Sequence, residues 1–173
     1  MIRAVFFDLG DTLITERVDD VRRLDHMDLH AKPGASDVLK QLSSRFRLAL
    51  VTDTESSNEQ AVRRALARLE LEKYFAAIVT SQDLGVTKPH PLMFQEAMRR
   101  TGVNPSETVM VGNDLDRDVE PAEALGLRAI LVRDSPYFDP KRFTTAPVAM
   151  TLIDVPDMIL AMDTCDRPGG RAP

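Results

Sequence analysis

The chain has a single cysteine and no long hydrophobic run, and each of these shortages excludes a class of protein. Because Cys165 has no partner for an internal disulfide, a reduced, cytoplasmic setting is favoured. No stretch approaches the roughly 18 consecutive apolar residues that a membrane span needs. The apolar run at the amino terminus ends at Asp8 after only a few residues, so it does not predict a signal peptide.

Positive charge is also in short supply, with 22 Lys and Arg residues against 27 Asp and Glu residues and a net charge of −5. Without a basic stripe, nucleic acid is not expected as the main partner, although a nucleotide substrate is still allowed. The apolar fraction of 43% and the charged fraction of 28% are ordinary for a soluble globular protein. A chain of 173 residues is most simply one domain with a proper core.

Five short runs rich in β-branched or aromatic residues predict strands, and the segments between them have helical spacing. The predicted strands are residues 3–8, 47–52, 76–81, 108–112 and 128–133. These runs are almost continuously apolar, which predicts a sheet that is covered on both faces. Alternation of such strands with helices predicts an α/β fold: a three-layer sandwich with a central parallel, Rossmann-like sheet.

Several segments outside this pattern carry predictions of their own. A helix is expected after the Pro33–Gly34 turn, with Ser36 as its N-cap. Residues 148–153 predict a final edge strand, and residues 154–162 a short helix. Three further segments lack a regular pattern: a charged flap at 14–32, a proline-containing loop at 134–147, and a tail at 164–173 that is expected to be disordered.

Polar residues stand where four of the five predicted strands end. Asp8 and Thr12 follow the first strand, Thr52 ends the second, the segment after the third leads to Lys88, and an acidic cluster follows the fourth. In an open parallel sheet, ligands bind outside the carboxyl ends of the strands. These side chains are therefore the candidates for a functional site.

This ordered set, with Lys88–Pro89 followed by Pro91 and Phe94, resembles the haloacid dehalogenase (HAD) superfamily of phosphohydrolases. The resemblance spans roughly residues 1–163. It implies one HAD-like hydrolase domain over that range, in which residues 14–32 form a flap or reduced cap.

The resemblance implies hydrolysis of phosphate monoesters by way of an aspartyl-phosphate. A carboxylate attacks phosphorus in line, and water then hydrolyses the acyl phosphate, while fixed cations neutralise charge on the transferring group. The implied catalytic residues are Asp8 as nucleophile, Thr52, Lys88 and Asp118, which would pair with Lys88. The implied substrate-binding residues are Thr12, Thr52, Asp53 and Lys88.

The same resemblance implies a Mg²⁺ cofactor, which suits a site with one or two carboxylates plus phosphate oxygens and water. Its implied ligands are the Asp8 carboxylate, the backbone carbonyl of Gly10, and the first acidic position after the fourth strand. In this chain Asn113 stands where the family carries that acidic ligand, and Asp114 follows it, so either residue is a candidate ligand.

Two residues depart from the family's pattern. Gly10 stands where the family's phosphatases usually carry the acid that protonates the leaving alcohol and then activates water. Asp11 or a water molecule could replace that acid, which is typically worth ~10²–10⁴ in rate. Asn113 stands where an aspartate usually meets the metal, and its neutral oxygen predicts weaker metal binding unless Asp114 contributes.

The spacing between motifs leaves no room for a sizeable cap between Asp8 and Thr52, or between Thr52 and Lys88. An uncapped site is open to water and to a phosphorylated small-molecule or macromolecular substrate, unless a neighbouring subunit of a homo-oligomer covers it. Specificity would then lie in the flap, in the 134–147 loop or in the partner subunit.

Other functions remain open on this sequence. Gly10 and Asn113 favour, as an alternative, a weakly active or inactive HAD-fold protein that binds a phosphorylated ligand or a protein partner. A phospho-receiver domain is disfavoured, because its phosphorylated Asp ends the third strand, where this chain has Thr80–Ser81. Dehalogenation or phosphonate cleavage would tolerate Gly10, but both normally rely on cap residues.

Overall fold

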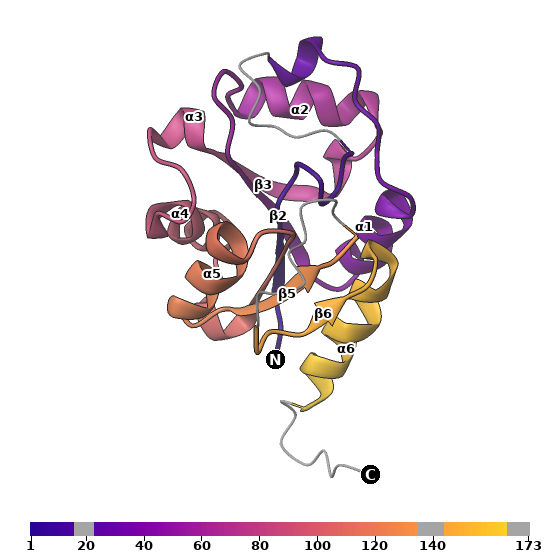
Figure 1. The fold of residues 1–173 in the computed structure, drawn as a ribbon, viewed down its shortest axis with the longest axis vertical. Coiled ribbons are helices and arrows are strands. Elements are labelled where there is room, and N and C mark those ends of the chain that lie inside the picture. Colours follow the sequence, from indigo (N-terminus) through magenta and orange to yellow (C-terminus); the bar gives the residue numbers. More distant parts are fainter. Residues whose placement is uncertain (16–22, 135–143, 166–173) are drawn as a thin grey trace.

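The computed structural model describes residues 1–15, 23–134 and 144–165, and a six-stranded sheet runs through its centre (Figure 1). The strand order is β3-β2-β1-β4-β5-β6, and every pair of neighbours is parallel. The strands are β1 (Ala4–Phe7), β2 (Arg47–Thr52), β3 (Phe75–Thr80), β4 (Thr108–Gly112), β5 (Arg128–Val132) and β6 (Val148–Ala149).

Helices cover both faces of this sheet. They are α1 (Ala35–Ser43), α2 (Glu59–Arg68), α3 (Ser81–Leu84), α4 (Pro91–Thr101), α5 (Glu120–Ala124) and α6 (Val155–Cys165). Apolar residues of α1, α2 and α6 pack into one cluster, and those of α4 and α5 pack into a second cluster on the opposite face. The predicted three-layer α/β sandwich with a parallel central sheet is confirmed.

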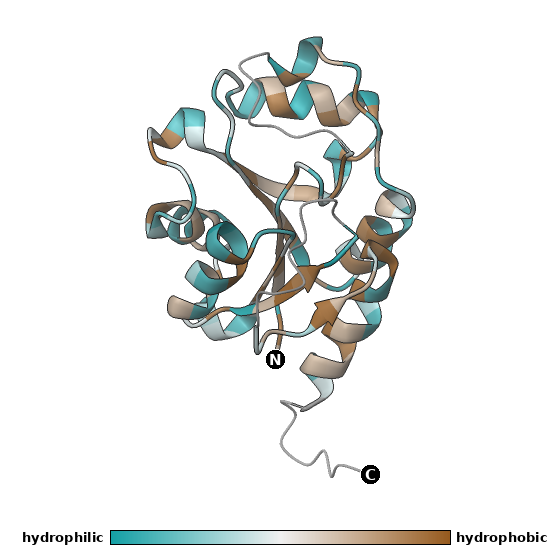
Figure 2. Ribbon diagram, viewed as in Figure 1, coloured by the Kyte–Doolittle hydropathy of each residue, from teal (hydrophilic) through white to brown (hydrophobic). Residues whose placement is uncertain are grey.

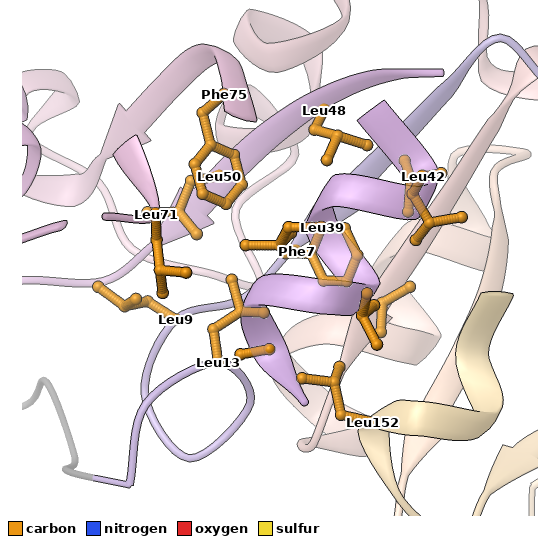
Figure 3. Packing of buried hydrophobic residues seen from close by; sticks show 14 of the residues in the cluster. Phe7, Leu9, Leu13, Leu39, Leu42, Leu48, Leu50, Leu71, Phe75 and Leu152 are labelled. Carbon is orange, nitrogen blue, oxygen red and sulfur yellow. The ribbon is translucent and has the colours of Figure 1, made fainter. Parts of the chain in front are cut away.

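The strands are apolar on both sides because both sides are buried. Successive residues of a strand point to opposite faces. In β1, Val5 and Phe7 therefore pack into the cluster with α1, while Ala4 and Phe6 pack into the cluster with α4. Figure 2 shows the central strands in the brown of apolar residues, and Figure 3 shows Phe7 among leucines of the first cluster, Leu39 of α1 included.

Two local predictions are wrong, and both fail at turns. The final edge strand ends at Ala149 instead of residue 153, because Asp154 accepts hydrogen bonds from the Thr151 amide (2.8 Å) and hydroxyl (3.2 Å) and turns the chain. Helix α1 is capped by Gly34 instead of Ser36. Gly34 has a φ of +80°, a left-handed conformation that glycine adopts readily, so the helix begins two residues early.

Parts of the less regular predictions lie outside the described residues: 16–22 of the flap, 135–143 of the loop and 166–173 of the tail. The expectation of disorder is wrong for residues 164 and 165, because α6 continues through Cys165. The extent of the domain, residues 1–163, stays a prediction. Among the described residues, no helix combines the length and the hydrophobicity that crossing a membrane would require.

Candidate active site

The parallel sheet brings the polar residues that follow β1, β2 and β4 to one edge. Strand β1 lies between β2 and β4, and Phe7 is in register with Leu50 on one side and with Val111 on the other. The Asp8 amide continues this ladder by donating to the carbonyl of Val111 at 3.0 Å. Residues that are more than forty positions apart in the chain therefore meet around Asp8.

Lys88 is the centre of the site. Its ammonium lies 2.6 Å from Asp8 Oδ1 and 2.6 Å from Asp118 Oδ1, and all three residues are buried. The Lys88 backbone amide donates to Asp53 Oδ1 at 2.8 Å, so the loop that follows β2 positions the main chain of Lys88 as well. The predicted pairing of Lys88 with Asp118 is present, and Asp8 completes a carboxylate–ammonium–carboxylate triad.

Electrostatics keep the lysine of this triad charged. Burial alone would lower the pKa of Lys88, but the carboxylates of Asp118, Asp8 and Asp53 outweigh burial and raise it, so the ammonium stays charged. Burial raises the pKa of Asp118 to about 7, with the Lys88 ammonium opposing this rise and the Asp8 carboxylate adding to it. The site thus holds a permanent cation beside the nucleophile candidate.

Gly112, the last residue of β4, makes room for Asp118. A Cβ atom at position 112 would overlap the Asp118 carboxylate, so only glycine allows that side chain to reach Lys88. Asp118 itself sits in a π-helical turn, Leu115–Val119, and its Oδ2 accepts from the Asp114 amide at 3.2 Å. The close approach of Gly112 to Asp118 explains why the fourth predicted strand ends in glycine.

Thr12 and Asn113 face Asp8 from two loops. The Thr12 hydroxyl is 3.2 Å from Asp8 Oδ2 and 3.2 Å from Asn113 Oδ1, so both oxygens converge on one point. Asp114 is used differently: its Oδ1 accepts from the amides of Asp116 (2.9 Å) and Arg117 (3.1 Å) and caps the π-helical turn. Of the two candidate metal ligands after β4, it is Asn113 whose side-chain oxygen contacts the same Thr12 hydroxyl as Asp8.

Thr52 and Asp53 lie at the end of β2. Thr52 is fully buried, and within the described part of the chain its hydroxyl makes a single, long contact of 3.5 Å with the carbonyl of Asp53. The Asp53 carboxylate is held by the Lys88 amide and by Arg117 Nη2. Direct contact of these two residues with a substrate stays a prediction, whereas the role of Asp53 in holding Lys88 and Arg117 is visible in the structure.

Sequence reasoning missed Arg117, although it lies within the acidic cluster that attracted attention. Burial lowers the pKa of Arg117, but its hydrogen bond to Asp53 and the charges of Asp53, Asp118 and Asp8 raise it above the usual value. Arg117 is therefore a second fixed cation close to Asp8. Its position between two aspartates at 116 and 118 was the available signal.

Lys32 was also missed, and no pattern in the sequence pointed to it. Its buried ammonium lies 3.2 Å from Asp11 Oδ1 and 3.0 Å from Asp134 Oδ1, and so links the loops that follow β1 and β5. Asp11 has a φ of +58° next to Gly10. The carboxylate that could replace the acid missing at position 10 is thus engaged in a buried ion pair.

The described part of the predicted flap is anchored on α2. Asp25 Oδ2 pairs with Arg64 at 2.8 Å, and Arg68 donates to the carbonyls of Asp25 and Met27. The Leu24 amide donates to Ser57 Oγ at 2.9 Å, in the loop that follows β2. Hydrogen bonding to Arg23 is the main cause that lowers the pKa of Asp25 to about 2; burial opposes it, and a weaker effect of the hydrogen bond to Arg64 adds to it. This segment therefore packs beside the loop that carries Asp53.

Among the described residues, no group of three or more His, Cys, Asp or Glu side chains is arranged to hold a metal ion. The donors that the site offers instead are one carboxylate (Asp8), one side-chain amide (Asn113) and backbone carbonyls. A cation at this place would complete its coordination with water or with oxygens of a ligand.

Comparison with known proteins agrees with this geometry. Residues 2–132 match the haloacid dehalogenase-like hydrolase family. A glyceraldehyde 3-phosphate phosphatase from Methanopyrus kandleri is 38% identical over 108 residues, which are 62% of this chain and 45% of that protein. A ribulose-1,5-bisphosphate 5-phosphatase from Halopiger xanaduensis is 33% identical over 115 residues, 66% of this chain and 44% of that protein. The chain thus spans less than half the length of these curated relatives.

Among solved structures, an uncharacterized protein from Listeria monocytogenes superposes with a TM-score of 0.83 at 23% identity, covering 94% of this chain and 99% of that one. At this level of identity the likeness concerns the fold. Together with the match over residues 2–132, it supports the α/β fold described above. The chain belongs to the haloacid dehalogenase-like hydrolase family.

Proposed function

We propose that the chain is a magnesium-dependent phosphomonoester hydrolase that works through an aspartyl-phosphate on Asp8. The observation that carries the proposal is the Lys88 ammonium, which is held 2.6 Å from both Asp8 and Asp118 in a buried site. A carboxylate beside a fixed cation at the end of a buried strand is suited to attack a phosphoryl group. The names of the two curated relatives, both phosphatases, support the same reaction class.

In the proposed reaction, a carboxylate oxygen of Asp8 forms a bond to phosphorus while the bond from phosphorus to the leaving oxygen breaks, and that oxygen takes a proton from water and departs as the alcohol. Water then hydrolyses the acyl phosphate and releases inorganic phosphate. Lys88 neutralises charge on the transferring group, and Asp118 and Asp53 hold it at its ammonium and its backbone amide. The hydroxyl of Thr52 and the backbone amides of the turn after Asp8 are the proposed donors to the phosphoryl oxygens.

The donor set fits Mg²⁺. This ion prefers oxygen ligands and commonly binds through one or two carboxylates plus water and substrate phosphate. The Asp8 carboxylate and the Asn113 amide oxygen converge on the Thr12 hydroxyl, so they can serve one cation, with the Gly10 carbonyl as a third ligand. When bound, the ion would supply positive charge opposite the transferring phosphoryl group.

Asp8→Asn tests the proposed nucleophile. The purified variant should lose hydrolysis of 4-nitrophenyl phosphate in the presence of Mg²⁺, because an amide oxygen does not form the acyl phosphate. Its melting temperature should stay within a few degrees of that of the wild type, since Asp8 lies at the sheet edge and not in the apolar clusters. Undiminished turnover by Asp8→Asn would show that another residue is the nucleophile.

A second candidate function is binding of a phosphorylated ligand with little turnover. Gly10 favours it, because the position usually held by the general acid has no side chain and the neighbouring Asp11 is paired with Lys32. This candidate predicts that the wild type binds phosphate esters by calorimetry but releases no phosphate from 4-nitrophenyl phosphate. Release of phosphate that Asp8→Asn abolishes would decide in favour of the hydrolase.

A further inference from the structure

A partly open cavity of about 620 Å³ lies beside the Lys88 cluster, between the loops that follow β2, β3 and β4. Asp53 and Arg117 line it, and so does Thr87, the residue directly before Lys88. The cavity therefore lies directly beside the two cations of the site, Lys88 and Arg117. Its volume is in the range of pockets that hold small-molecule ligands.

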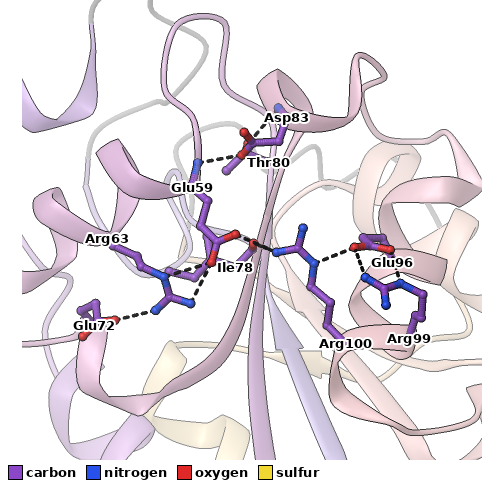
Figure 4. Close-up of polar contacts among 9 residues, drawn as sticks. All are labelled: Glu59, Arg63, Glu72, Ile78, Thr80, Asp83, Glu96, Arg99 and Arg100. Atoms are coloured by element: carbon purple, nitrogen blue, oxygen red, sulfur yellow. Dashed lines mark hydrogen bonds and ion pairs between the residues drawn. The ribbon is translucent and has the colours of Figure 1, made fainter.

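The walls of this cavity are fixed by hydrogen bonds between two loops. Ser81 Oγ accepts from the Thr54 amide at 2.8 Å and donates to the Thr54 carbonyl at 2.9 Å. Next to this pair, Asp83 Oδ2 accepts from the Glu59 amide at 2.7 Å and from the Thr80 hydroxyl (Figure 4). A cavity with walls held this way is preformed, so a ligand need not order them.

Several polar groups that line the cavity are not used by the protein. In the described part of the chain, the side chains of Glu55, Gln82 and Thr87 make no hydrogen bond or ion pair, and all three residues are exposed. Arg117 uses Nη2 on Asp53, which leaves its other N–H groups without an acceptor among those residues. The cavity thus presents donors and acceptors side by side.

The charge of the lining disfavours an anion. Asp53 already balances the Arg117 guanidinium, and Glu55 adds a further carboxylate. Gly85 and Val86 are the apolar residues of the lining, and carbon atoms of the lining residues together expose somewhat more surface to the cavity than their nitrogen and oxygen atoms do, so a ligand meets apolar as well as polar contacts. A hydroxyl group both donates and accepts, so several hydroxyls on one ligand would match a mixture of amide, hydroxyl, carboxylate and guanidinium groups.

We propose that this cavity binds the leaving portion of the substrate and selects a neutral, polyhydroxylated group through Gln82, Thr87 and Arg117. The proposal rests on the proposed function, because it needs the phosphoryl group to sit at Asp8 and Lys88. It places specificity on Arg117 and on the segment between β3 and Lys88, instead of on the flap or on a neighbouring subunit.

Three phosphate esters of similar length test the ligand class. Glycerol 3-phosphate carries two hydroxyls, propyl phosphate carries none, and 3-phosphoglycerate carries a carboxylate. We expect glycerol 3-phosphate to have a KM about three- to tenfold below that of propyl phosphate, which corresponds to roughly one net hydrogen bond. The carboxylate-bearing ester should have a higher KM than glycerol 3-phosphate. A preference for 3-phosphoglycerate would mean that Arg117 binds an anion and would overturn the proposal.

Variants at positions 82 and 87 test whether these residues cause the preference for hydroxyl groups. Gln82→Leu and Thr87→Val keep the size of each side chain and remove its hydrogen-bonding groups. In each of them, the advantage of glycerol 3-phosphate over propyl phosphate should shrink by about threefold. Gln41→Leu is the matched control: it makes the same change at an exposed position of α1, on the opposite face of the sheet. An equal loss in Gln41→Leu, or no loss in either cavity variant, would contradict the assignment.

Binding to the Asp8→Asn protein separates this inference from the proposed function. Calorimetry with Mg²⁺ should give a lower Kd for glycerol 3-phosphate than for propyl phosphate, and Gln82→Leu in that background should narrow the difference. This hydroxyl preference without turnover by the wild type would support the cavity and reject the hydrolase. Turnover by the wild type without any hydroxyl preference would support the hydrolase and reject the cavity. Absence of both ester binding and wild-type turnover would overturn both proposals.

Discussion

At the scale of single residues, the site concentrates buried carboxylates around one lysine. Asp8, Asp53 and Asp118 are each at most 6% exposed, and all three raise the pKa of Lys88, whose ammonium pairs with Asp8 and Asp118. Burying a charged group costs free energy unless it is well paired, and here the carboxylates outnumber the ammonium. We interpret this as an arrangement kept for function at some expense of stability.

Because of Asp118, the stability of the folded protein should depend on pH. Its folded-state pKa is about 7, whereas an unfolded aspartate titrates near 3.9. Between these two values the unfolded chain has released the proton that the folded protein still holds, so stability falls as the pH rises. Asp118→Asn does not titrate. The stability of the wild type relative to this variant should therefore drop by a few kcal/mol, as an order of magnitude, between pH 4 and pH 7.

Urea unfolding of both proteins at pH 4, pH 7 and pH 8, without magnesium, measures this difference. The wild type should lose more stability than Asp118→Asn on going to pH 8. If the difference between the two proteins were the same at all three pH values, Asp118 would be ionised throughout, and the pull of Lys88 would outweigh the effect of burial.

Gly112 is a residue where one methyl group should disable the site. Gly112→Ala places a Cβ where the Asp118 carboxylate lies, so Asp118 must move and release Lys88. Misplacement of a catalytic group by about 1 Å costs ~10²-fold in rate, and we expect a loss of kcat of that order. The fold should survive with a penalty of about 1–3 kcal/mol from overpacking.

Val62→Ala controls for lost stability alone, because Val62 is buried on α2 in an apolar cluster away from the Lys88 triad. It should lower the melting temperature and leave kcat at 25 °C close to that of the wild type. Equal loss of kcat in both variants would indicate that Gly112 matters only for stability.

At the scale of elements, an ionic network ties α2 to α4 across the outer strand β3 (Figure 4). Glu59 is its centre: one oxygen pairs with Arg63 at 2.9 Å and the other with Arg100 at 2.7 Å. Arg100 also donates to the carbonyl of Ile78 at 3.0 Å. The network therefore covers part of the exposed edge of the sheet, where unpaired backbone groups would otherwise invite another strand.

Glu59→Gln should lower the free energy of unfolding by roughly 1 kcal/mol, because partly exposed ion pairs contribute about 0.2–1 kcal/mol each and this residue makes two. Urea unfolding measures the loss, which should shrink in 1 M salt. Glu70→Gln is the matched control, since Glu70 is highly exposed and makes one long contact of 3.7 Å with Lys73. A loss in Glu70→Gln as large as that in Glu59→Gln would refute the special role of Glu59.

The elements themselves were predictable wherever local pattern decides them. The run 47–52 reads as a buried strand because both faces of β2 are covered, and its bounds agree with the structure. Strand β6 was overestimated because residues 148–153 have strand propensity, while the hydrogen bonds between Thr151 and Asp154 turn the chain. Hydrophobic periodicity could not predict this turn, because it depends on one side-chain acceptor, Asp154, three residues after Thr151.

At the scale of the whole molecule, the candidate site was predictable because a parallel sheet converts order along the chain into proximity. Thr52 ends a strand and Asp8 and Asn113 each follow one, and the sheet places those strand ends together. The contacts of Lys32 with Asp11 and Asp134 were not predictable, since they depend on how separate loops meet in the folded protein. Lys32 and Asp134, for example, are 102 residues apart in the chain. The sequence pattern thus predicts where the site lies, whereas tertiary packing decides which residues pair with one another there.

The same whole-molecule view predicts how magnesium should act on stability. A ligand that binds only the folded state raises its stability, and a tenfold lower Kd is worth about 1.4 kcal/mol at a fixed, excess ligand concentration. With Asn113 as a neutral ligand beside Asp8, we expect wild-type binding of Mg²⁺ to be weak. Asn113→Asp adds a carboxylate next to Asp8, which should destabilise the metal-free protein by repulsion and strengthen Mg²⁺ binding.

Melting temperatures recorded over a Mg²⁺ titration, together with calorimetry, test this. Asn113→Asp should melt below the wild type without metal and should need less Mg²⁺ for half of its thermal shift. Asp114→Asn is the control: asparagine keeps the Oδ1 acceptor that caps the π-helical turn, so Mg²⁺ affinity should not change. If Asp114→Asn weakened binding while Asn113→Asp did not strengthen it, Asp114 would be the metal ligand, and its cap of the π-helical turn would have to open for the metal to bind.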